Sequence, residues 1–246
     1  MSRLADASVV LFVHAHPDDE TISTGALMHE FAQRGARVVL LTASRGERGE
    51  IVAAVQHLIG DDPDALTAAR EQELADALTV LGVTEHYFLG TPPARAAGRQ
   101  PRRYSDSGMR WVRPGLAGPA ADVPGDALTS APLDDVVADV HALIDTVAPT
   151  LVISYDDHGG YGHPDHLRIR EAARCAAHQS HVPFAAIVET PGTDVEWFEL
   201  RQHMSVVQDA LGKHATQLTV DGADIIHSGG QREPIVTSVG LRPVDG

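Results

Sequence analysis

The hydrophobic positions of this chain form short continuous runs that alternate with segments of helical periodicity. Residues 8–14 (SVVLFVH) and 36–42 (ARVVLLT) are almost wholly apolar, which is typical of strands buried on both faces of a parallel sheet. Between these runs, Leu27 and Phe31 are spaced as one face of a helix, and Gly35 is a suitable residue for its C-terminal end. This order predicts a strand, a helix and a second, parallel strand.

The same alternation continues over most of the chain. Three further helical segments each lead into an apolar run, at residues 63–82 and 86–90, 132–149 and 150–156, and 163–179 and 183–189. Asp134 and Asp135 stand in the first turn of one of these helices, where the helix dipole favours acidic side chains. The pattern predicts a single α/β domain over residues 1–246, with a Rossmann-like, doubly wound and mostly parallel sheet, right-handed crossovers and helices on both faces.

Two regions depart from this alternation. Residues 90–131 are rich in Pro, Gly and Arg and show no sustained period. Because long loops inside a compact domain usually cover an active site or are disordered, we expect this region to be an active-site lid. Residues 218–246 mix β-like triplets with turn pairs such as DG and GG, which predicts a tail of short strands and turns rather than a separate domain.

Composition and charge restrict the partners of the protein. A chain of 246 residues with 43% hydrophobic residues is long enough to bury a core, and its formal net charge of -15 repels nucleic acids and anionic membranes. There is no apolar run of membrane-spanning length and no apolar leader in the first residues, MSRLADAS. The single cysteine, Cys175, excludes an internal disulfide and is expected to pack in a helix core. These features predict a cytoplasmic protein that acts on a small molecule, and they are compatible with a homo-oligomer.

Histidines and carboxylates cluster directly after two of the predicted strands. The sequence HAHPDDE (residues 14–20) follows the first strand, and YDDHGGYGHPDH (residues 155–166) follows the strand that starts at Thr150. Ligands of open α/β sheets bind beyond the carboxyl ends of the strands, at the point where the strand order reverses. We therefore expect these two strands to be neighbours across that point, and their polar residues to converge at one site.

The residue types in the two clusters suit a catalytic metal. Zinc in hydrolytic sites takes three protein ligands from His, Asp or Glu and keeps one position for water. His16, Asp19 and His166 offer two neutral imidazoles and one carboxylate, a set with which Zn2+ lowers the pKa of its water from about 15.7 to about 7. Fe2+ suits the same ligands in a reducing cell, and two histidines with a carboxylate are also the ligands of non-haem iron oxygenases.

Neighbouring residues have the chemistry that hydrolysis requires. Asp18 stands beside a ligand and is free to act as a general base, which favours hydrolysis over oxygen activation. His163 is expected to stabilise the oxygen that becomes negative during attack on a carbonyl, and Asp165 is expected to orient His166. HPDH also has the pattern of a helix N-terminus with Pro164 in its first position. The turn after the first strand lacks the G-x-G-x-x-G of dinucleotide sites, and its carboxylates would repel a pyrophosphate.

The two motifs together resemble the PIG-L/LmbE-like family of zinc-dependent N-acetylglucosaminyl deacetylases. The resemblance rests on AHPDDE and HPDH, with RGERG from Arg45, REQELADALTVLGV from Arg70 and HATQL near the end of the chain. SDSGM, from Ser105, is similar to the mycothiol-type branch. The family implies an amidohydrolase that removes an N-acetyl or other N-acyl group from a glucosamine-type amino sugar conjugate, in mycothiol or related metabolism. A mycothiol S-conjugate amidase, a natural-product sugar deacetylase and a non-catalytic sugar-binding relative remain as alternatives.

The resemblance also implies roles for individual residues. The residues that match the family pattern are the zinc ligands His16, Asp19 and His166, the general base Asp18, His163 for the tetrahedral intermediate or the leaving amine, Tyr161 for polarising the carbonyl, and Arg70, Asp106 and Glu47 for the substrate. Arg70 also has Glu73 within reach on its own helix, and Asp106 also suits a turn. His14 is expected to be a hydrogen-bonded structural residue, and His214 matches the family without a role. The segment between HPDH and HATQ is shorter here than in mycothiol-type proteins, so part of the pocket wall is expected to differ.

Overall fold

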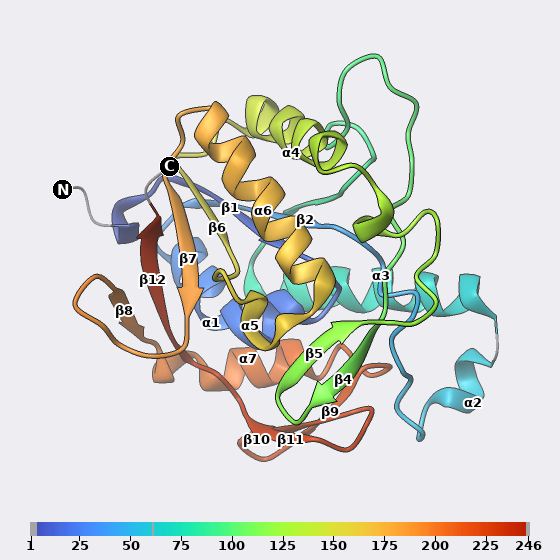
Figure 1. Ribbon diagram of the computed structural model, residues 1–246. Coiled ribbons are helices and arrows are strands. Elements are labelled where there is room, and N and C mark those ends of the chain that lie inside the picture. Colours follow the sequence, from blue (N-terminus) through green and yellow to red (C-terminus); the bar gives the residue numbers. More distant parts are fainter. Residues whose placement is uncertain (1–3, 61, 245–246) are drawn as a thin grey trace.

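A computed structural model describes residues 4–60 and 62–244 of the chain, and its centre is a seven-stranded sheet (Figure 1). The strands follow in the order β3 (Glu85–Phe88), β2 (Arg37–Thr42), β1 (Val9–His14), β6 (Leu151–Ser154), β7 (Phe184–Val188), β12 (Ser238–Val244) and β8 (Glu196–Glu199). The strands from β3 to β7 in this order are parallel, and β12 pairs antiparallel with both β7 and β8. The prediction of a mostly parallel α/β sheet is confirmed.

Helices cover both faces of this sheet, as the sequence predicts. One layer contains α1 (Asp19–Gln33), α3 (Pro63–Leu81) and α7 (Met204–Leu211), and the other contains α4 (Leu133–Val147) and α6 (Pro164–Gln179). Side chains of β1 alternate between the two layers: Val10 and Phe12 enter the first core, and Leu11 and Val13 enter the second. Because both faces of the strand are buried, its sequence is apolar at successive positions.

Helix ends lie where the sequence places them. α3 ends at Leu81, and Gly82 follows with a φ of 77°, a left-handed conformation that glycine adopts without strain. α1 ends at Gln33, and Gly35 has a φ of 82°. The periodicity does not predict the short helices α2 (Gln56–Ile59) and α5 (Gly159–Gly162), or the 3₁₀ turns at Leu4–Asp6, Leu128–Ser130 and Arg201–His203.

The strand order reverses between β1 and β6, as predicted. β1 lies between β2 and β6, with Leu11 opposite Val39 on one side and Val152 on the other. The chain leaves β1 towards α1 in one helix layer, and it leaves β6 towards α6 in the other. Helices that depart to opposite faces open a crevice beyond the carboxyl ends of the two strands. The two polar clusters of the sequence follow these two strands and meet at that crevice.

Residues 90–131 contain a β-hairpin, which the sequence pattern does not predict. β4 (Met109–Arg113) pairs antiparallel with β5 (Leu116–Pro119), and the side chains of β4 are mostly exposed. A strand of this kind lacks the apolar alternation by which strands are predicted. Asp139 of α4 holds the start of the region in place, because its buried carboxylate accepts hydrogen bonds from Arg95 (2.8 Å) and from the Tyr104 hydroxyl (2.7 Å). The region is therefore ordered, and its role as a lid stays a prediction.

The end of the chain, up to residue 244, forms a small sheet of short strands and then a last strand of the central sheet. The small sheet of this region consists of β9 (Leu218–Asp221), β10 (Asp224–His227) and β11 (Arg232–Pro234). β12 then enters the central sheet between β7 and β8, where Val239 and Leu241 join the core. This last strand is an integral part of the main sheet, which the sequence pattern does not predict. None of the helices within residues 4–60 and 62–244 has the length and apolarity to cross a membrane.

Candidate metal centre and active site

The first polar cluster lies in the turn between β1 and α1, where Asp18 has an unusual backbone conformation. Its φ of 102° lies in a region that residues with a side chain rarely adopt, at a cost of about 1–3 kcal/mol. The Asp18 N–H donates to Glu20 Oε2 (3.0 Å), and the N–H groups of Thr21 and Ile22 donate to the Asp18 carbonyl oxygen (3.0 and 2.9 Å). Strain that is held in place by its surroundings is typical of functional sites.

The second cluster lies between β6 and α6. Gly159, Gly160 and Gly162 all have a positive φ, which lets the chain turn sharply before His163. His163 caps α6, because its Nδ1 accepts a hydrogen bond from the Asp165 N–H (3.1 Å). The interpretation of HPDH as a helix N-terminus is therefore confirmed. The same cap fixes the position of the histidines in the first turn of α6.

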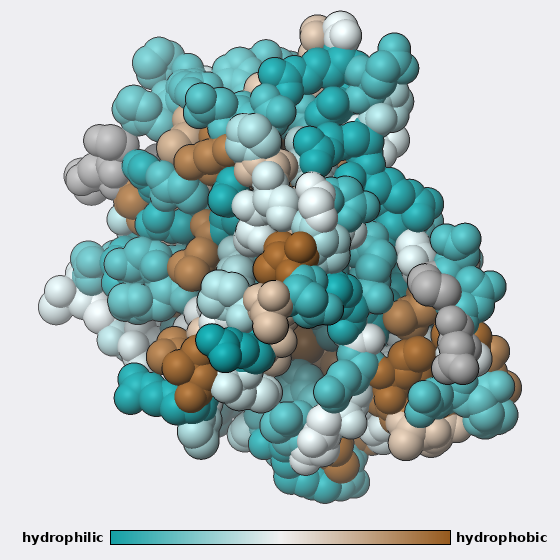
Figure 2. Space-filling view, turned by 45° about the vertical axis from the view of Figure 1, so that its right-hand side comes forward, coloured by the Kyte–Doolittle hydropathy of each residue, from teal (hydrophilic) through white to brown (hydrophobic). Residues whose placement is uncertain are grey.

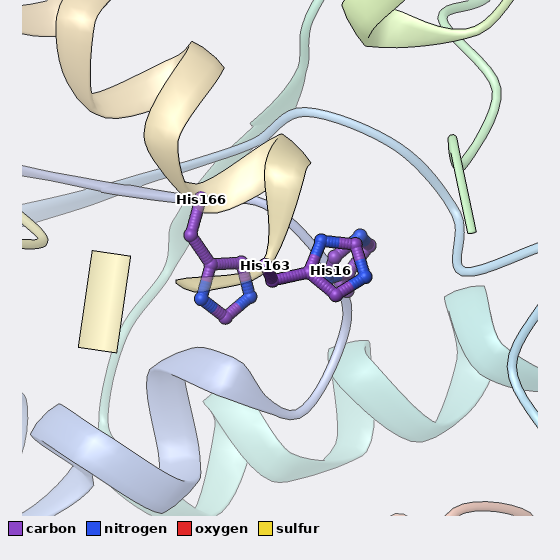
Figure 3. A group of neighbouring side chains, drawn as sticks. All are labelled: His16, His163 and His166. Atoms are coloured by element: carbon purple, nitrogen blue, oxygen red, sulfur yellow. The ribbon is translucent and has the colours of Figure 1, made fainter. Parts of the chain in front are cut away.

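Three imidazoles from the two clusters come together at the crevice, as Figure 3 shows. His16, His163 and His166 each place one ring nitrogen within 4.8 Å of the others. Asp19 Oδ2 lies 3.2 Å from His16 Nδ1 and 3.3 Å from His166 Nε2. The fold thus brings His16, Asp19 and His166 together, and their role as metal ligands stays a prediction.

The hydrogen bonds of His166 leave one of its ring nitrogens available to a cation. Its Nδ1 lies 3.1 Å from the Gly159 carbonyl oxygen, which only accepts, so Nδ1 carries the proton of the neutral ring. The lone pair of Nε2 then faces the Asp19 carboxylate, and this buried nitrogen has no hydrogen-bond partner among the described residues. Two acceptors that face each other need a proton or a cation between them. The arrangement fits a divalent metal.

A carboxylate holds His16 on the side away from Asp19. The Nε2 of His16 lies 3.1 Å from Asp165 Oδ2, and its Nδ1 remains beside Asp19. Asp165 also accepts hydrogen bonds from the N–H (2.9 Å) and the hydroxyl of Ser107. Carboxylates of this kind commonly fix the tautomer and orientation of histidines that bind metals. The prediction that Asp165 orients His166 is wrong, because consecutive residues of a helix point in directions about 100° apart.

His163 is arranged as a hydrogen-bond donor. Because its Nδ1 accepts from the Asp165 N–H, the neutral ring carries its proton on Nε2. Burial, together with the neighbouring rings of His16 and His166, lowers the pKa of His163 to about 3, so the ring is neutral at pH 7. Its Nε2–H group therefore suits the stabilisation of an oxygen that becomes negative.

The pKa of Asp18 lies close to neutral pH. Burial and the charge of Asp19 raise the pKa of Asp18 to about 7, while the charges of His214 and Arg70 lower it. A cation bound at Asp19 would lower it further by attraction. A carboxyl group that titrates close to neutral pH is suited to accept a proton from water.

Tyr155 is a site residue that the sequence analysis missed. Its hydroxyl donates to Asp19 Oδ2 (2.7 Å) and accepts from the Ala15 N–H (2.8 Å). Its ring stacks on His166, with 4.2 Å between the centroids and 8° between the planes. Tyr155 follows β6 directly, and its function depends on β6 lying beside β1. The sequence signal that could have identified Tyr155 is its position directly after a strand that borders the predicted crevice.

The predicted substrate carboxylates, Glu47 and Asp106, lie together beside the crevice. Glu47 Oε2 accepts from the Asp106 N–H (3.0 Å). Asp106 Oδ1 accepts from the Gly108 N–H (2.7 Å), so the interpretation of Asp106 as a turn residue is confirmed. The same oxygen lies 3.7 Å from His16 Nε2. Contact of Glu47 and Asp106 with a substrate stays a prediction.

Arg70 supports the loop that carries Glu47. Its side chain is 2% exposed, and its guanidinium donates to the carbonyl oxygens of Gly46 and Glu50, the latter at 3.0 Å. The alternative partner, Glu73, instead accepts hydrogen bonds from Thr216 (2.8 and 2.7 Å). The predicted contact of Arg70 with a substrate stays a prediction.

Tyr161 is the exposed aromatic residue of the site. Its ring centroid lies 5.1 Å from that of His166 and 6.1 Å from that of His163, and the residue is 38% exposed. Burial of the Tyr161 hydroxyl and the charge of Asp19 raise the pKa of Tyr161 well above its usual range. The hydroxyl is therefore protonated at neutral pH and is a hydrogen-bond donor.

Two buried histidines support the turn between β1 and α1. His14 Nε2 lies 3.0 Å from the Thr24 hydroxyl, so the expectation of a structural histidine is confirmed. His214 Nε2 lies 3.3 Å from Glu20 Oε1 and 3.1 Å from the Thr21 hydroxyl. Because Glu20 also accepts the N–H of Asp18, His214 anchors the turn from the far end of the chain.

Comparison with known sequences identifies one family. The family model of PIG-L, GlcNAc-PI de-N-acetylase, matches residues 11–177. A 1D-myo-inositol 2-acetamido-2-deoxy-alpha-D-glucopyranoside deacetylase of Kineococcus radiotolerans is 46% identical over 173 residues, which are 70% of this chain and 45% of that relative. The chain spans about half the length of the curated relatives that it matches.

Solved structures have the same fold. A deacetylase in the biosynthesis pathway of teicoplanin superposes with a TM-score of 0.63 and 23% identity, over 96% of this chain and 99% of that one. The zinc-inhibited form of teicoplanin deacetylase gives a TM-score of 0.61 and 21% identity, with the same coverage. These similarities support the arrangement of the sheet and its helices.

Proposed function

Because this chain belongs to the PIG-L family of GlcNAc-PI de-N-acetylases, we propose that it is a metal-dependent amidohydrolase that removes an N-acetyl group from a glucosamine-type amino sugar conjugate. One observation carries the proposal. The unprotonated Nε2 of His166 faces the carboxylate of Asp19 at 3.3 Å, in a crevice that also contains the carboxyl group of Asp18 with a pKa of about 7. A site for a cation and a nearby proton acceptor are the two requirements of metal-assisted hydrolysis.

The metal would be held by His16, Asp19 and His166. Zn2+, or Fe2+ in a reducing cell, would supply the polarisation of the amide carbonyl and the acidification of water. His16 offers Nδ1 beside Asp19, because its Nε2 is occupied by Asp165. A teicoplanin deacetylase of the same fold has a zinc-inhibited form, so zinc binds to that protein.

The side chains of this chain would divide the proton transfers of the reaction. Asp18 takes a proton from the attacking water, and the new C–O bond turns the carbonyl into an oxyanion. The Nε2–H of His163 and the hydroxyl of Tyr161 donate hydrogen bonds to that oxygen. As the C–N bond breaks, the protonated Asp18 returns its proton to the nitrogen, so that acetate and a free amine leave.

The substrate is proposed to be a glucosamine ring that carries a further group. Relatives named for a myo-inositol conjugate of acetamido-glucopyranoside favour this substrate class. Glu47 and Asp106 offer carboxylates to the hydroxyl groups of the sugar, and Arg70 holds the loop that carries Glu47. Hydrolysis of a mycothiol S-conjugate is the alternative, since it breaks the same type of amide bond. We also propose a cytoplasmic location and no partner beyond the small molecule, apart from a second copy in a homo-oligomer.

Acetate release from metal-defined protein tests the proposal. We expect the chelated protein to be inactive, and we expect Zn2+ or Fe2+ to restore the release of acetate from N-acetylglucosaminyl-inositol. A mycothiol S-conjugate and N-acetylglucosamine serve as the comparison substrates. Full activity after exhaustive removal of metal, or no acetate from any acetamido sugar, would show that the proposal is wrong.

A further inference from the structure

An exposed aromatic pair lies at the entrance of the crevice. Trp111 of β4 is 47% exposed, and its ring centroid lies 5.6 Å from that of Tyr161, with 39° between the ring planes. Figure 1 shows the β4–β5 hairpin directly beside α5, the helix that carries Tyr161. On the face shown in Figure 2, apolar side chains form separate patches within a mostly hydrophilic surface. Exposed aromatic residues that adjoin a functional site commonly contact a ligand.

The hairpin is packed so that Trp111 is held towards the site. Trp111 pairs across the hairpin with Ala117, which is 6% exposed and whose carbonyl oxygen lies next to Gly162. Leu116 of the same strand also contacts the Gly162 position, so the hairpin rests on the glycine turn that precedes His163. The next residue, Val112, is 60% exposed and lies over Gly118. The pairing register shifts between Trp111 and Arg113, so Val112 lies in a bulge of the strand; its side chain lies beside Gly118, whereas Trp111 lies beside Tyr161 of α5.

The spacing of the rings indicates the order in which a bound substrate would contact them. Tyr161 contacts both neighbours: its centroid lies 5.1 Å from that of His166 and 5.6 Å from that of Trp111. A substrate whose acetamido group reaches His163 and His166 would therefore pass Tyr161 before it reaches Trp111. The part of the substrate beside Trp111 is the group attached to the amino sugar, not the sugar that is deacetylated.

We propose that Trp111, together with Tyr161, forms a subsite that binds the ring attached to the amino sugar, either a cyclitol or a second sugar. The inference rests on the proposed function and extends it to the specificity of the same site. Indole and phenol rings offer large, rigid faces against which the C–H face of a six-membered ring packs, and Trp and Tyr are common anchors of recognition. Arg110 and Arg113 are exposed on the same strand and leave the surroundings of the subsite polar. Polar surroundings suit a hydroxylated ring better than an apolar partner protein.

Comparison of one-ring and two-ring substrates tests the subsite. For Trp111→Ala we expect kcat/KM on N-acetylglucosaminyl-inositol to fall about tenfold, mainly through a higher KM, and kcat/KM on N-acetylglucosamine to stay unchanged. Trp111→Tyr should recover most of the loss, because it restores an aromatic face. Val112→Ala is the matched control at the next residue of the same strand, whose exposed side chain lies beside Gly118 and not beside Tyr161, and we expect wild-type kinetics on both substrates. Equal losses on both substrates, or no loss on the two-ring substrate, would overturn the inference.

Fluorescence gives a readout that does not depend on catalysis. The chain has two tryptophans, so Trp197→Phe leaves Trp111 as the only one. Titration of this variant with glucosaminyl-inositol should change its emission and saturate, whereas glucosamine should have no effect. An unchanged emission with glucosaminyl-inositol would overturn the subsite even if the enzyme is active. If Trp111→Ala instead abolishes self-association in gel filtration without changing this binding, the patch is an interface and the inference is wrong. Saturable binding without acetate release would leave the subsite intact and contradict the proposed function.

Discussion

Replacing Tyr155 with phenylalanine tests how the candidate metal centre is held in place. The substitution removes only the hydroxyl, which donates to Asp19 Oδ2 (2.7 Å) and accepts from the Ala15 N–H (2.8 Å). The ring, which stacks on His166, is kept. If Asp19 is a metal ligand, its carboxylate loses the hydrogen bond that orients it, while every proposed ligand atom remains.

The expected magnitudes follow from these contacts. Loss of a hydrogen bond to a charged carboxylate costs about 1.5–3 kcal/mol of the free energy of unfolding, and the buried Ala15 N–H also loses its partner. Removal of a group that orients a metal ligand typically weakens metal affinity by about 10–100-fold. We therefore expect Tyr155→Phe to be folded, less stable, and poorer in metal binding by at least tenfold.

Tyr104→Phe is a matched control. The Tyr104 hydroxyl also donates to a buried carboxylate, Asp139, at the same 2.7 Å, but this pair lies at the start of the 90–131 region. We expect a similar loss of stability, measured by denaturant unfolding of the metal-free proteins, and no change in Zn2+ affinity, measured by competition with a chelating dye. Wild-type affinity in Tyr155→Phe, or an equal loss of affinity in both variants, would refute the role of Tyr155 and of Asp19 in metal binding.

Three further predictions concern the neighbouring carboxylates. Asp19→Asn should lose metal, measured by metal analysis, whereas Asp18→Asn should keep it and lose about 10²-fold or more in single-turnover rate; the reverse pattern would exchange the two roles. Because the pKa of Asp18 is raised to about 7 and a bound cation lowers it, the acidic limb of kcat/KM should titrate between 3.8 and 7 and change in Asp18→Asn. For the buried pair of Glu20 and His214, burial opposes both charges, but the hydrogen bond and attraction between them lower the pKa of Glu20 below 4.5 and raise that of His214 above 6.5. The pair therefore stabilises the fold fully between pH 4.5 and pH 6.5, and less as pH falls through the lowered pKa of Glu20 or rises through the raised pKa of His214. The unfolding free energy of the metal-free wild type should exceed that of Glu20→Gln by about 3–5 kcal/mol at about pH 5.5, and by less at either pH extreme. A difference independent of pH would contradict this.

The parts of the fold that the sequence predicts are those in which local pattern and burial agree. β1 is apolar at successive positions because both of its faces are buried, and Gly82 ends α3 because its φ of 77° favours glycine. The crevice was predictable as well, because polar clusters follow two strands of a doubly wound sheet, and the strand order does place β1 and β6 side by side. The hairpin of β4 and β5 was not predictable from periodicity, because its side chains are mostly exposed.

The contacts within the site depend on geometry that no local pattern contains. Tyr155 reaches Asp19 only because β6 lies beside β1, and Asp165 contacts His16, not the adjacent His166, because of the direction in which α6 presents it. His214 Nε2 lies 3.3 Å from Glu20 Oε1 and 3.1 Å from the Thr21 hydroxyl, although 193 residues of sequence separate His214 from Thr21. The residue types of the site were therefore predictable from the motifs, and their partners were not.

The same contacts explain why a cation is the expected occupant of the site. Asp19, Asp106 and Asp165 gather around His16, and Asp18 adds a further carboxyl group beside Asp19; burial makes such charges costly unless a partner compensates for them. Protonation of Asp18 is one way to relieve this cost, and a divalent cation beside Asp19 is another. A cation also stabilises the folded state by mass action, by about 2.7 kcal/mol at a concentration of 100 times its dissociation constant. The strained turn at Asp18 and the crowded carboxylates thus lower the stability of the metal-free protein, and in the proposed function the same features would provide the affinity for the metal and the free base that hydrolysis requires.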